Sequence, residues 1–308
     1  MRFEKIEARN MSEKKLLFVF NPKSGTGLIK NYLLDIVDIM VKAGYEPTLY
    51  PTQMQGDAIR KIKEDGVKYD RIVCSGGDGT LDEVVTGLRE ADLYVPLGYI
   101  PAGSTNDFAK TVGIPNDMLK AAEIAVGDHI FPCDVGQFND DTFVYIVGFG
   151  IFTDISYETP QELKNILGHA AYILSAAKSL ASIPKYLMHV EANGEIIQER
   201  FIYGMITNSI SVAGIKGLTG KDVELDDGEF EVTLIKGPEN PKELNDIILY
   251  LTGAIAETPM VYRFKTSHLI IRSRSSVSWT MDGENGGEHW SVEIKNHHRK
   301  LNLLTPTE

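Results

Sequence analysis

Apolar residues in the first 126 positions occur in two patterns, short continuous runs and stretches with helical spacing. The continuous runs predict buried strands at residues 16–20, 45–50, 70–74 and 97–100. Apolar positions that repeat every three or four residues predict helices at residues 29–40, 56–64, 80–89, 108–112 and 118–126. Because strand and helix alternate, the pattern favours a parallel sheet with helices on both faces.

The pattern changes near Asp134, after which strand-like runs dominate. Strands are expected at residues 143–147, 187–192, 198–207, 230–235, 268–273, 277–281, 290–295 and 301–304. Asn193-Gly194 is a two-residue hairpin signal, and helices are expected at about 161–182 and 241–255. The sequence therefore predicts an α/β plus all-β protein, with an N-terminal doubly wound, Rossmann-like domain and a C-terminal antiparallel β-sandwich domain.

The length, net charge and cysteine positions of the chain limit the classes of protein to which it could belong. A chain of 308 residues is long enough for two domains, and its formal net charge of -12 argues against nonspecific binding to nucleic acid. Cys74 and Cys133 both lie in apolar runs and are expected to be core residues, which favours the cytosol. No signal peptide is recognised, and residues 166–177 are too short for a membrane span.

A glycine turn at Ser75-Gly76-Gly77-Asp78-Gly79-Thr80 separates a predicted strand from a helix expected to begin near Thr80. Three glycines within four residues allow close approach of a ligand, and the free N–H groups of a helix start favour anions. Asp78 would repel a phosphate unless a metal or water lay between them, and a capping role is the alternative. The turn is not the dinucleotide-binding fingerprint G-x-G-x-x-G, because Asp82 occupies the position of its last glycine. It is not a Walker A loop either, because no Gly-Lys-Ser/Thr sequence occurs in the chain.

Three loops are expected at the carboxyl ends of the parallel strands, where ligands bind in such sheets. They are residues 21–25, 76–80 and 101–107, and all are rich in Gly, Ser, Thr or Asn. Their convergence predicts a nucleotide or phosphate site. Lys23 would contact a phosphate or remain solvated, and Asp107 would hold metal-bound water or cap the next helix.

Two acidic segments of the second half are candidates for further chemistry. Asp222, within residues 219–229, could hold a hard divalent cation or belong to a plain acidic turn. Asp282-Gly283-Glu284 could supply a carboxylate that deprotonates an alcohol, or could form a simple Asp-Gly turn.

Taken in order, these motifs resemble the diacylglycerol kinase catalytic family, and most closely its soluble bacterial lipid kinases. The resemblance covers residues 16–304 and rests on Asn21-Pro22-Lys23-Ser24-Gly25, Gly76-Gly77-Asp78-Gly79-Thr80, residues 101–109, Asp134 and Asp282-Gly283-Glu284. It implies phosphorylation of diacylglycerol or a related lipid alcohol by ATP with Mg²⁺, giving a phosphatidic-acid-type product. It places the protein in phospholipid metabolism, in the cytoplasm and at the inner face of the membrane.

The resemblance also implies roles for individual residues. Contacts with ATP are implied for Asn21, Pro22, Lys23, Ser24, Gly25, Thr52, Gly77, Asp78, Gly79, Thr80, Leu81, Asp82, Glu83 and Ser104. Asp78, itself expected to be catalytic, would join Asp107 and Asp134 in an acidic, water-bridged network around the magnesium. Asp282 or Glu284 would take the proton of the lipid hydroxyl. Thr219, Asp222 and Glu224 match a structural magnesium site.

ATP would bind between two domains. The first comprises residues 12–135, with about 290–308 returning to it, and the second, residues 136–289, would take the lipid. An apolar stretch at 166–187 would form a wall for the lipid or pack on the β domain. The expected partners are ATP, a lipid alcohol and, transiently, a membrane surface, but no nucleic acid. The oligomeric state, including a homodimer, is left open.

Two alternative functions are compatible with the glycine turn. An NAD-kinase-like phosphotransferase would share this turn, but residues 21–25 and the Asp282-Gly283-Glu284 turn favour a lipid acceptor. A non-catalytic sensor of nucleotide or lipid would not need Asp78 and Asp282, and both are present.

Overall fold

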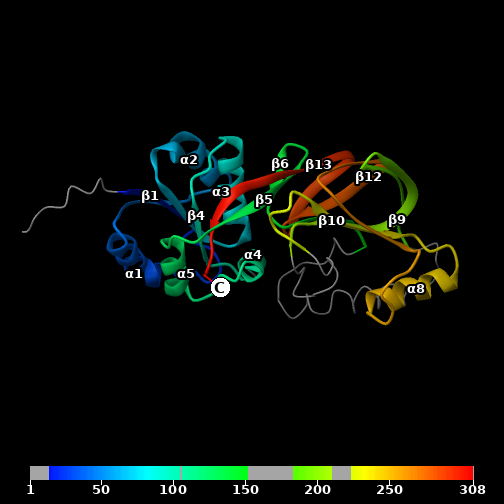
Figure 1. Cartoon of the computed structure of the whole chain (residues 1–308), viewed down its shortest axis with the longest axis horizontal. Coiled ribbons are helices and arrows are strands. Elements are labelled where there is room, and N and C mark those ends of the chain that lie inside the picture. The colour runs from blue at the N-terminus through cyan, green and yellow to red at the C-terminus, as the bar shows by residue number, and fades with distance from the viewer. Residues whose placement is uncertain (1–13, 105, 152–182, 210–222, 308) are drawn as a thin grey trace, which may run out of the picture.

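The first half of the chain forms a parallel sheet (Figure 1). The computed structural model describes residues 14–104, 106–151, 183–209 and 223–307. Four strands lie side by side in the order β2 (Tyr45–Pro51), β1 (Lys14–Phe20), β3 (Arg71–Gly76) and β4 (Leu97–Pro101). Leu16 to Phe20 of β1 and every residue of β3 are buried, because helices cover both faces of these strands.

The helices pack in two groups. α1 (Ile29–Lys42) contacts α5 (Met118–Ala125), and α2 (Asp57–Asp65) contacts α3 (Asp78–Glu90). Figure 1 shows α2 and α3 above the parallel strands and α1 and α5 below them, as the alternation of strand and helix predicts. The remaining helices of this half are the short α4 (Asp107–Thr111) and the 3₁₀ turn η1 (Gly66–Lys68). α3 begins at Asp78, two residues before the predicted start at Thr80.

The second half is dominated by antiparallel strands. They are β5 (Ile130–Phe138), β6 (Asp141–Phe143), β7 (Ile146–Gly150), β8 (Tyr186–Ala192), β9 (Glu195–Thr207), β10 (Phe230–Lys236), β11 (Val261–Thr266), β12 (His268–Met281) and β13 (Glu284–Leu304), with one described helix, α8 (Pro241–Leu251). The separate strands predicted at 268–273 and 277–281 form the single strand β12, whose pairing with β13 is irregular between Arg272 and Val277. β11 was not predicted because, at the sheet edge, its cationic residues interrupt the apolar pattern.

The long strand β13 joins the two halves. It pairs antiparallel with β12 and β5, and its last residues lie parallel to β4, with Leu303 opposite Leu97. The hydrogen-bonded strands of the described residues therefore form one connected network of mixed α/β character. Each half keeps its own apolar core, one around Phe18 and Tyr99 and the other around Phe149 and Trp279.

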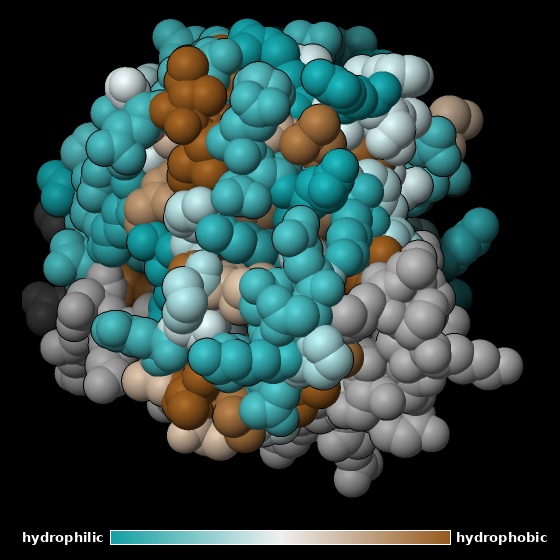
Figure 2. All heavy atoms as spheres, turned by 90° about the vertical axis from the view of Figure 1, so that its right-hand side faces the viewer, coloured by the Kyte–Doolittle hydropathy of each residue, from teal (hydrophilic) through white to brown (hydrophobic). Residues whose placement is uncertain are grey.

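The surface at the β-rich end is mostly hydrophilic. In Figure 2, which shows this end, the coloured apolar atoms lie in separate groups instead of one broad face. Among the described residues, no helix has both the length and the apolar character required to cross a membrane. The helix predicted at 161–182, and the part of the apolar stretch 166–187 that precedes residue 183, lie outside the described residues.

Candidate functional site

Three loops meet at the carboxyl ends of β1, β3 and β4, as the strand order predicts. A Cβ atom added to Gly25 would lie 2.5 Å from the carbonyl oxygen of Ala102, and one added to Gly103 would lie 2.6 Å from the Cα of Gly77. Gly25 also has a left-handed φ of +54°. The loops touch through their backbones, so only glycine fits at these contacts.

Backbone hydrogen bonds and one side chain hold the loops in place. The N–H of Asn21 donates to the carbonyl of Ser75 at 2.9 Å, and the N–H of Ala102 donates to that of Gly76 at 2.8 Å. Asn106, in a left-handed conformation, accepts from the N–H of Gly103 at 2.9 Å and donates to its carbonyl at 3.0 Å. The sequence analysis included Asn106 in the third loop but gave it no individual role, although asparagine is among the few residues that adopt this conformation readily.

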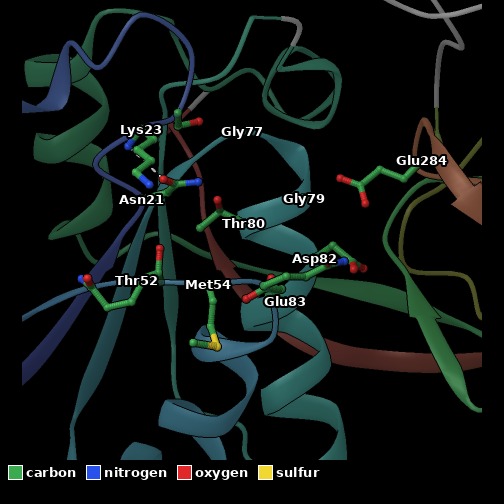
Figure 3. A pocket seen from close by; sticks show the side chains of 13 residues that line it. Asn21, Lys23, Thr52, Met54, Gly77, Gly79, Thr80, Asp82, Glu83 and Glu284 are labelled. Atoms are coloured by element: carbon green, nitrogen blue, oxygen red, sulfur yellow. Dashed lines mark hydrogen bonds between the residues drawn. The ribbon is translucent and has the colours of Figure 1, made fainter.

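A polar cavity of about 510 Å³ opens beside these loops (Figure 3). It is lined by Asn21, Lys23, Ser24, Thr52, Gln53, Met54, Gln55, Gly77, Gly79, Thr80, Asp82, Glu83 and Glu284. All but three of these residues were predicted, and the additions are Gln53, Met54 and Gln55, which follow Thr52. Figure 3 shows Glu284 beside the first turn of α3, on the side of the helix opposite Asn21 and Thr52, with its carboxylate directed toward Gly79.

A second cavity of about 270 Å³ adjoins the first, and both are lined by Gly79, Asp82 and Glu284. Its walls come from the two halves of the chain. α3 supplies one side, and β6 and the turn between β12 and β13 supply the other, including Thr142 and Asp282. Residues more than 200 positions apart therefore face the same space.

Asp282 is fixed by three backbone N–H groups of the segment between β6 and β7. Its Oδ2 accepts from Val144 at 2.6 Å, and its Oδ1 accepts from Tyr145 at 3.1 Å and Ile146 at 2.9 Å. Only 8% of Asp282 is exposed. Burial raises its pKa from 3.8 to about 7, although the three hydrogen bonds act in the opposite direction. The sequence could not reveal these donors, because they are backbone atoms about 137 positions away.

Carboxylates dominate the charge of both cavities. Asp82, Glu83 and Glu284 line both, whereas Lys23 is the only lysine or arginine among the described lining residues. The Oδ1 atom of Asp82 is buried without a hydrogen-bond partner. Burial, and then the charges of Asp282 and Glu284, raise the pKa of Asp82 well above its ordinary value. A bound cation would relieve this repulsion.

Glu83 also has a structural contact. Its carboxylate accepts from the N–H groups of Gly56 at 2.8 Å and Ala58 at 3.2 Å, at the N-terminus of α2. This contact joins α2 to α3 and holds the segment after Thr52 against the cavity.

Several predicted residues do not line the cavities. Pro22, Gly25 and exposed Ser104 belong to the converging loops, and the side chain of Leu81 lies in the core. Asp78 is the first residue of α3, and the side chain of Asp107 is not among those described. The carboxylate of buried Asp134 accepts from the N–H groups of Gly228 and Arg299, both at 2.7 Å, and from Asn296. That these three aspartates act as one network stays a prediction.

The predicted structural magnesium site falls mostly outside the described residues. Thr219 and Asp222 lie in the segment that is not described, and Glu224 is exposed. Within the described part of the chain, no three His, Cys, Asp or Glu side chains are grouped as metal ligands. In phosphate sites Mg²⁺ commonly binds through one or two carboxylates together with phosphate oxygens of the substrate.

The geometry combines two chemical capacities. Backbone N–H groups and neutral side chains at the loop end can bind phosphate oxygens without adding a large charge. A carboxylate whose pKa is close to neutrality can accept a proton at physiological pH. The site can therefore hold a phosphate donor next to a base that activates a hydroxyl group.

Comparisons with known proteins identify related sequences. The profile of the diacylglycerol kinase catalytic domain matches residues 15–138. The chain is 32% identical over 297 residues to a diacylglycerol kinase of Bacillus subtilis (strain 168), covering 96% of this chain and 97% of that protein. It is 33% identical over 295 residues to a diacylglycerol kinase of Staphylococcus haemolyticus (strain JCSC1435), covering 94% and 88%.

A solved structure shows the same fold. The crystal structure of a diacylglycerol kinase from Bacillus anthracis str. Sterne matches with a TM-score of 0.73 at 23% sequence identity. The match covers 96% of this chain and 98% of that one. The similarity therefore extends over both halves of the molecule.

Proposed function

This chain belongs to the diacylglycerol kinase catalytic family and is a lipid kinase, and from that premise we propose that it transfers the γ-phosphoryl group of ATP to the free hydroxyl of a diacylglycerol. The product would be a phosphatidic acid. The observation that carries the proposal is the position of Asp282 and Glu284 at cavities lined on their other side by the glycine turn of α3.

The triphosphate would lie along the first cavity. The N–H groups at the start of α3, together with Asn21, Ser24 and Lys23, surround its loop end and would contact phosphate oxygens. Thr52 and the exposed side chain of Met54 line the wall formed by the 52–55 segment. A cavity of about 510 Å³ is within the range that small-molecule sites occupy.

The donor set fits a hard divalent cation, and we propose Mg²⁺. Asp82 carries a buried oxygen without a partner, and it would share the ion with phosphate oxygens of the nucleotide. When bound, the ion neutralises phosphate charge and favours transfer. Asp78, Asp107 and Asp134 are proposed as the water-bridged network around it, and Thr219, Asp222 and Glu224 as a second, structural site.

We assign the base to Asp282. Two carboxylate oxygens offer about four acceptor positions, and three are filled by the N–H groups of residues 144–146. The remaining position is available to the hydroxyl group of the lipid. The raised pKa of Asp282, about 7, suits proton transfer near neutral pH. Glu284, exposed beside Gly79, would orient the reacting groups.

We further infer the division into domains. Residues 12–135 and about 290–308 would form the Rossmann-like nucleotide domain, supported by the pairing of β13 with β4. Residues 136–289 would form an antiparallel β-sandwich that takes the lipid, supported by the separate core around Phe149. Binding of such a lipid implies transient contact with the inner face of a membrane.

The test is a product assay with matched acceptors. The purified chain is incubated with ATP and Mg²⁺, with diacylglycerol in anionic vesicles, with empty vesicles, or with NAD. Phosphatidic acid and ADP should form together only with diacylglycerol. Phosphorylation of NAD in place of the lipid would favour the NAD-kinase alternative, and ATP binding without ADP release would favour a sensor.

A further inference from the structure

One face of α3 is turned toward the β-rich half along its whole length. Gly79, Asp82, Thr86 and Arg89 follow one another at spacings of three, four and three residues, so they lie on one stripe of the helix. A Cβ atom on Gly79 would lie 2.5 Å from Oε1 of Glu284. Asp82 and Thr86 line the second cavity opposite Thr142 and Asp282.

Arg89, the last residue of this stripe, forms hydrogen bonds with two residues of the β-rich half. Its Nε donates to Oγ1 of Thr142 at 2.8 Å, and a terminal nitrogen donates to the carbonyl oxygen of Asp140 at 3.1 Å. Thr142 is 1% exposed, so the hydroxyl end of this part-buried hydrogen bond is largely removed from bulk water.

Thr142 is adjacent in sequence to the segment that holds the base. Val144, two residues later, donates to Oδ2 of Asp282, and Tyr145 and Ile146 donate to Oδ1. Between Thr142 and these donors lies only Phe143, which is fully buried. A displacement of Thr142 relative to α3 would therefore move the three donors and the carboxylate together.

We infer that Arg89 is a positioning residue, which ties β6 to α3 and thereby sets the distance between the carboxylate of Asp282 and the nucleotide bound at the start of the helix. Arg89 itself lines neither cavity. The same helix, α3, forms part of the proposed nucleotide site at its first turn and the hydrogen bond from Arg89 to Thr142 at its last turn. The inference rests on the proposed function, because it assigns Asp282 as the base.

The consequence is a selective loss of rate. Displacement of a reacting group by about 1 Å can cost about 10²-fold in rate. Arg89→Ala should therefore lower kcat by about tenfold or more, while KM for ATP stays within about twofold, because the loops that bind ATP are untouched. Thr142→Val removes the same bond from the other side and keeps the volume of the side chain, so it should reproduce the loss.

The experiment measures kcat and KM for ATP with diacylglycerol vesicles for Arg89→Ala, Thr142→Val, Thr142→Ser and the double variant of Arg89→Ala with Thr142→Val. The double variant should be no slower than the slower single variant, because both remove one interaction. Thr142→Ser keeps the hydroxyl and should retain the wild-type kcat within about twofold. The matched control is Arg272→Ala, since Arg272 pairs with Glu191 within the β-rich half.

A merely structural role for Arg89 predicts a different result. It would lower the melting temperature, while kcat per folded molecule, counted by calorimetric titration with ADP, would stay at the wild-type value. That result, additive losses in the double variant, or a rise in KM for ATP instead of a fall in kcat would each overturn the inference. If the wild-type protein forms no phosphatidic acid, the proposed function fails and the inference fails with it.

Discussion

Replacing Asp282 by asparagine removes a buried ionisable group without changing its shape. In the wild-type protein, burial raises the pKa of Asp282 from 3.8 to about 7. The folded state therefore binds this proton more tightly than the unfolded state, and the contribution of Asp282 to stability is fully present below about pH 4. It is lost as the pH rises toward 7, where the folded protein must carry a buried charge.

The size of this effect follows from the two pKa values. The interval from 3.8 to about 7 corresponds to about 4 kcal/mol, at about 1.36 kcal/mol for each pH unit. Because Asp282 is only 8% exposed, screening by water reduces this figure little. The Asp282→Asn variant has no such titration, so its stability relative to the wild type should rise by about 4 kcal/mol between pH 4 and pH 8.

The assay is urea unfolding of both proteins at half-unit steps from pH 4 to pH 8, in EDTA and without nucleotide. Groups that do not interact with Asp282 titrate alike in both proteins and cancel in the difference, whereas Asp82, whose pKa is raised in part by the charge of Asp282, adds to the rise. A difference that stays constant over this range would refute the reasoning. It would mean that the three N–H donors of residues 144–146 fully offset burial, so that Asp282 ionises at its ordinary pKa.

The same variant tests the assignment of the base. Loss of a general base lowers kcat by about 10²–10⁴-fold, whereas ATP binding should persist because Asp282 lies in the second cavity. In the wild-type protein, kcat should rise with pH through a midpoint near 7, where Asp282 loses its proton. If Asp282→Asn kept a near-normal rate, the assigned base would be wrong, and a strong loss in Glu284→Gln instead would point to Glu284.

The remaining predictions concern the nucleotide end of the site. Asp78→Ala should abolish turnover and weaken calorimetric binding of magnesium-ATP, whereas intact ATP binding would exclude its role in the metal network. Gly25→Ala should lower the free energy of unfolding, measured in urea, by at least about 1–2 kcal/mol, because Gly25 has a φ of +54° and the new Cβ would lie 2.5 Å from the carbonyl oxygen of Ala102. Unchanged stability and unchanged ATP affinity would refute the contact between the loops. Asn106→Ala removes two bonds to Gly103 and should raise KM for ATP, with a loss of about 1–3 kcal/mol in stability. Removal of divalent ions by EDTA should stop turnover, and added Mg²⁺ should restore it.

Local pattern in the sequence was sufficient for much of the first half. The continuous apolar run at Leu16 to Phe20 and the periodic apolar positions of α1 and α3 are signals that each segment carries by itself. The start of α3 was placed two residues late, because Asp78 and Gly79 have low helix propensity and were assigned to the turn. Edge strand β11 and the length of β13 were missed, because their pattern depends on which neighbours cover each face.

The sequence by itself determined the chemical groups of this protein: a glycine turn before a helix, two polar loops, and an acidic turn near the C-terminus. It could name Asp282 and Glu284 as alternatives but could not choose between them. Tertiary structure gives the two carboxylates different environments, because three backbone N–H groups from residues 144–146 and burial surround Asp282 whereas Glu284 is exposed, and our proposal of Asp282 as the base rests on this difference. The contact of Arg89 with Thr142 likewise arises only when α3 and β6 pack together, since no local pattern encodes a hydrogen bond between residues 53 positions apart.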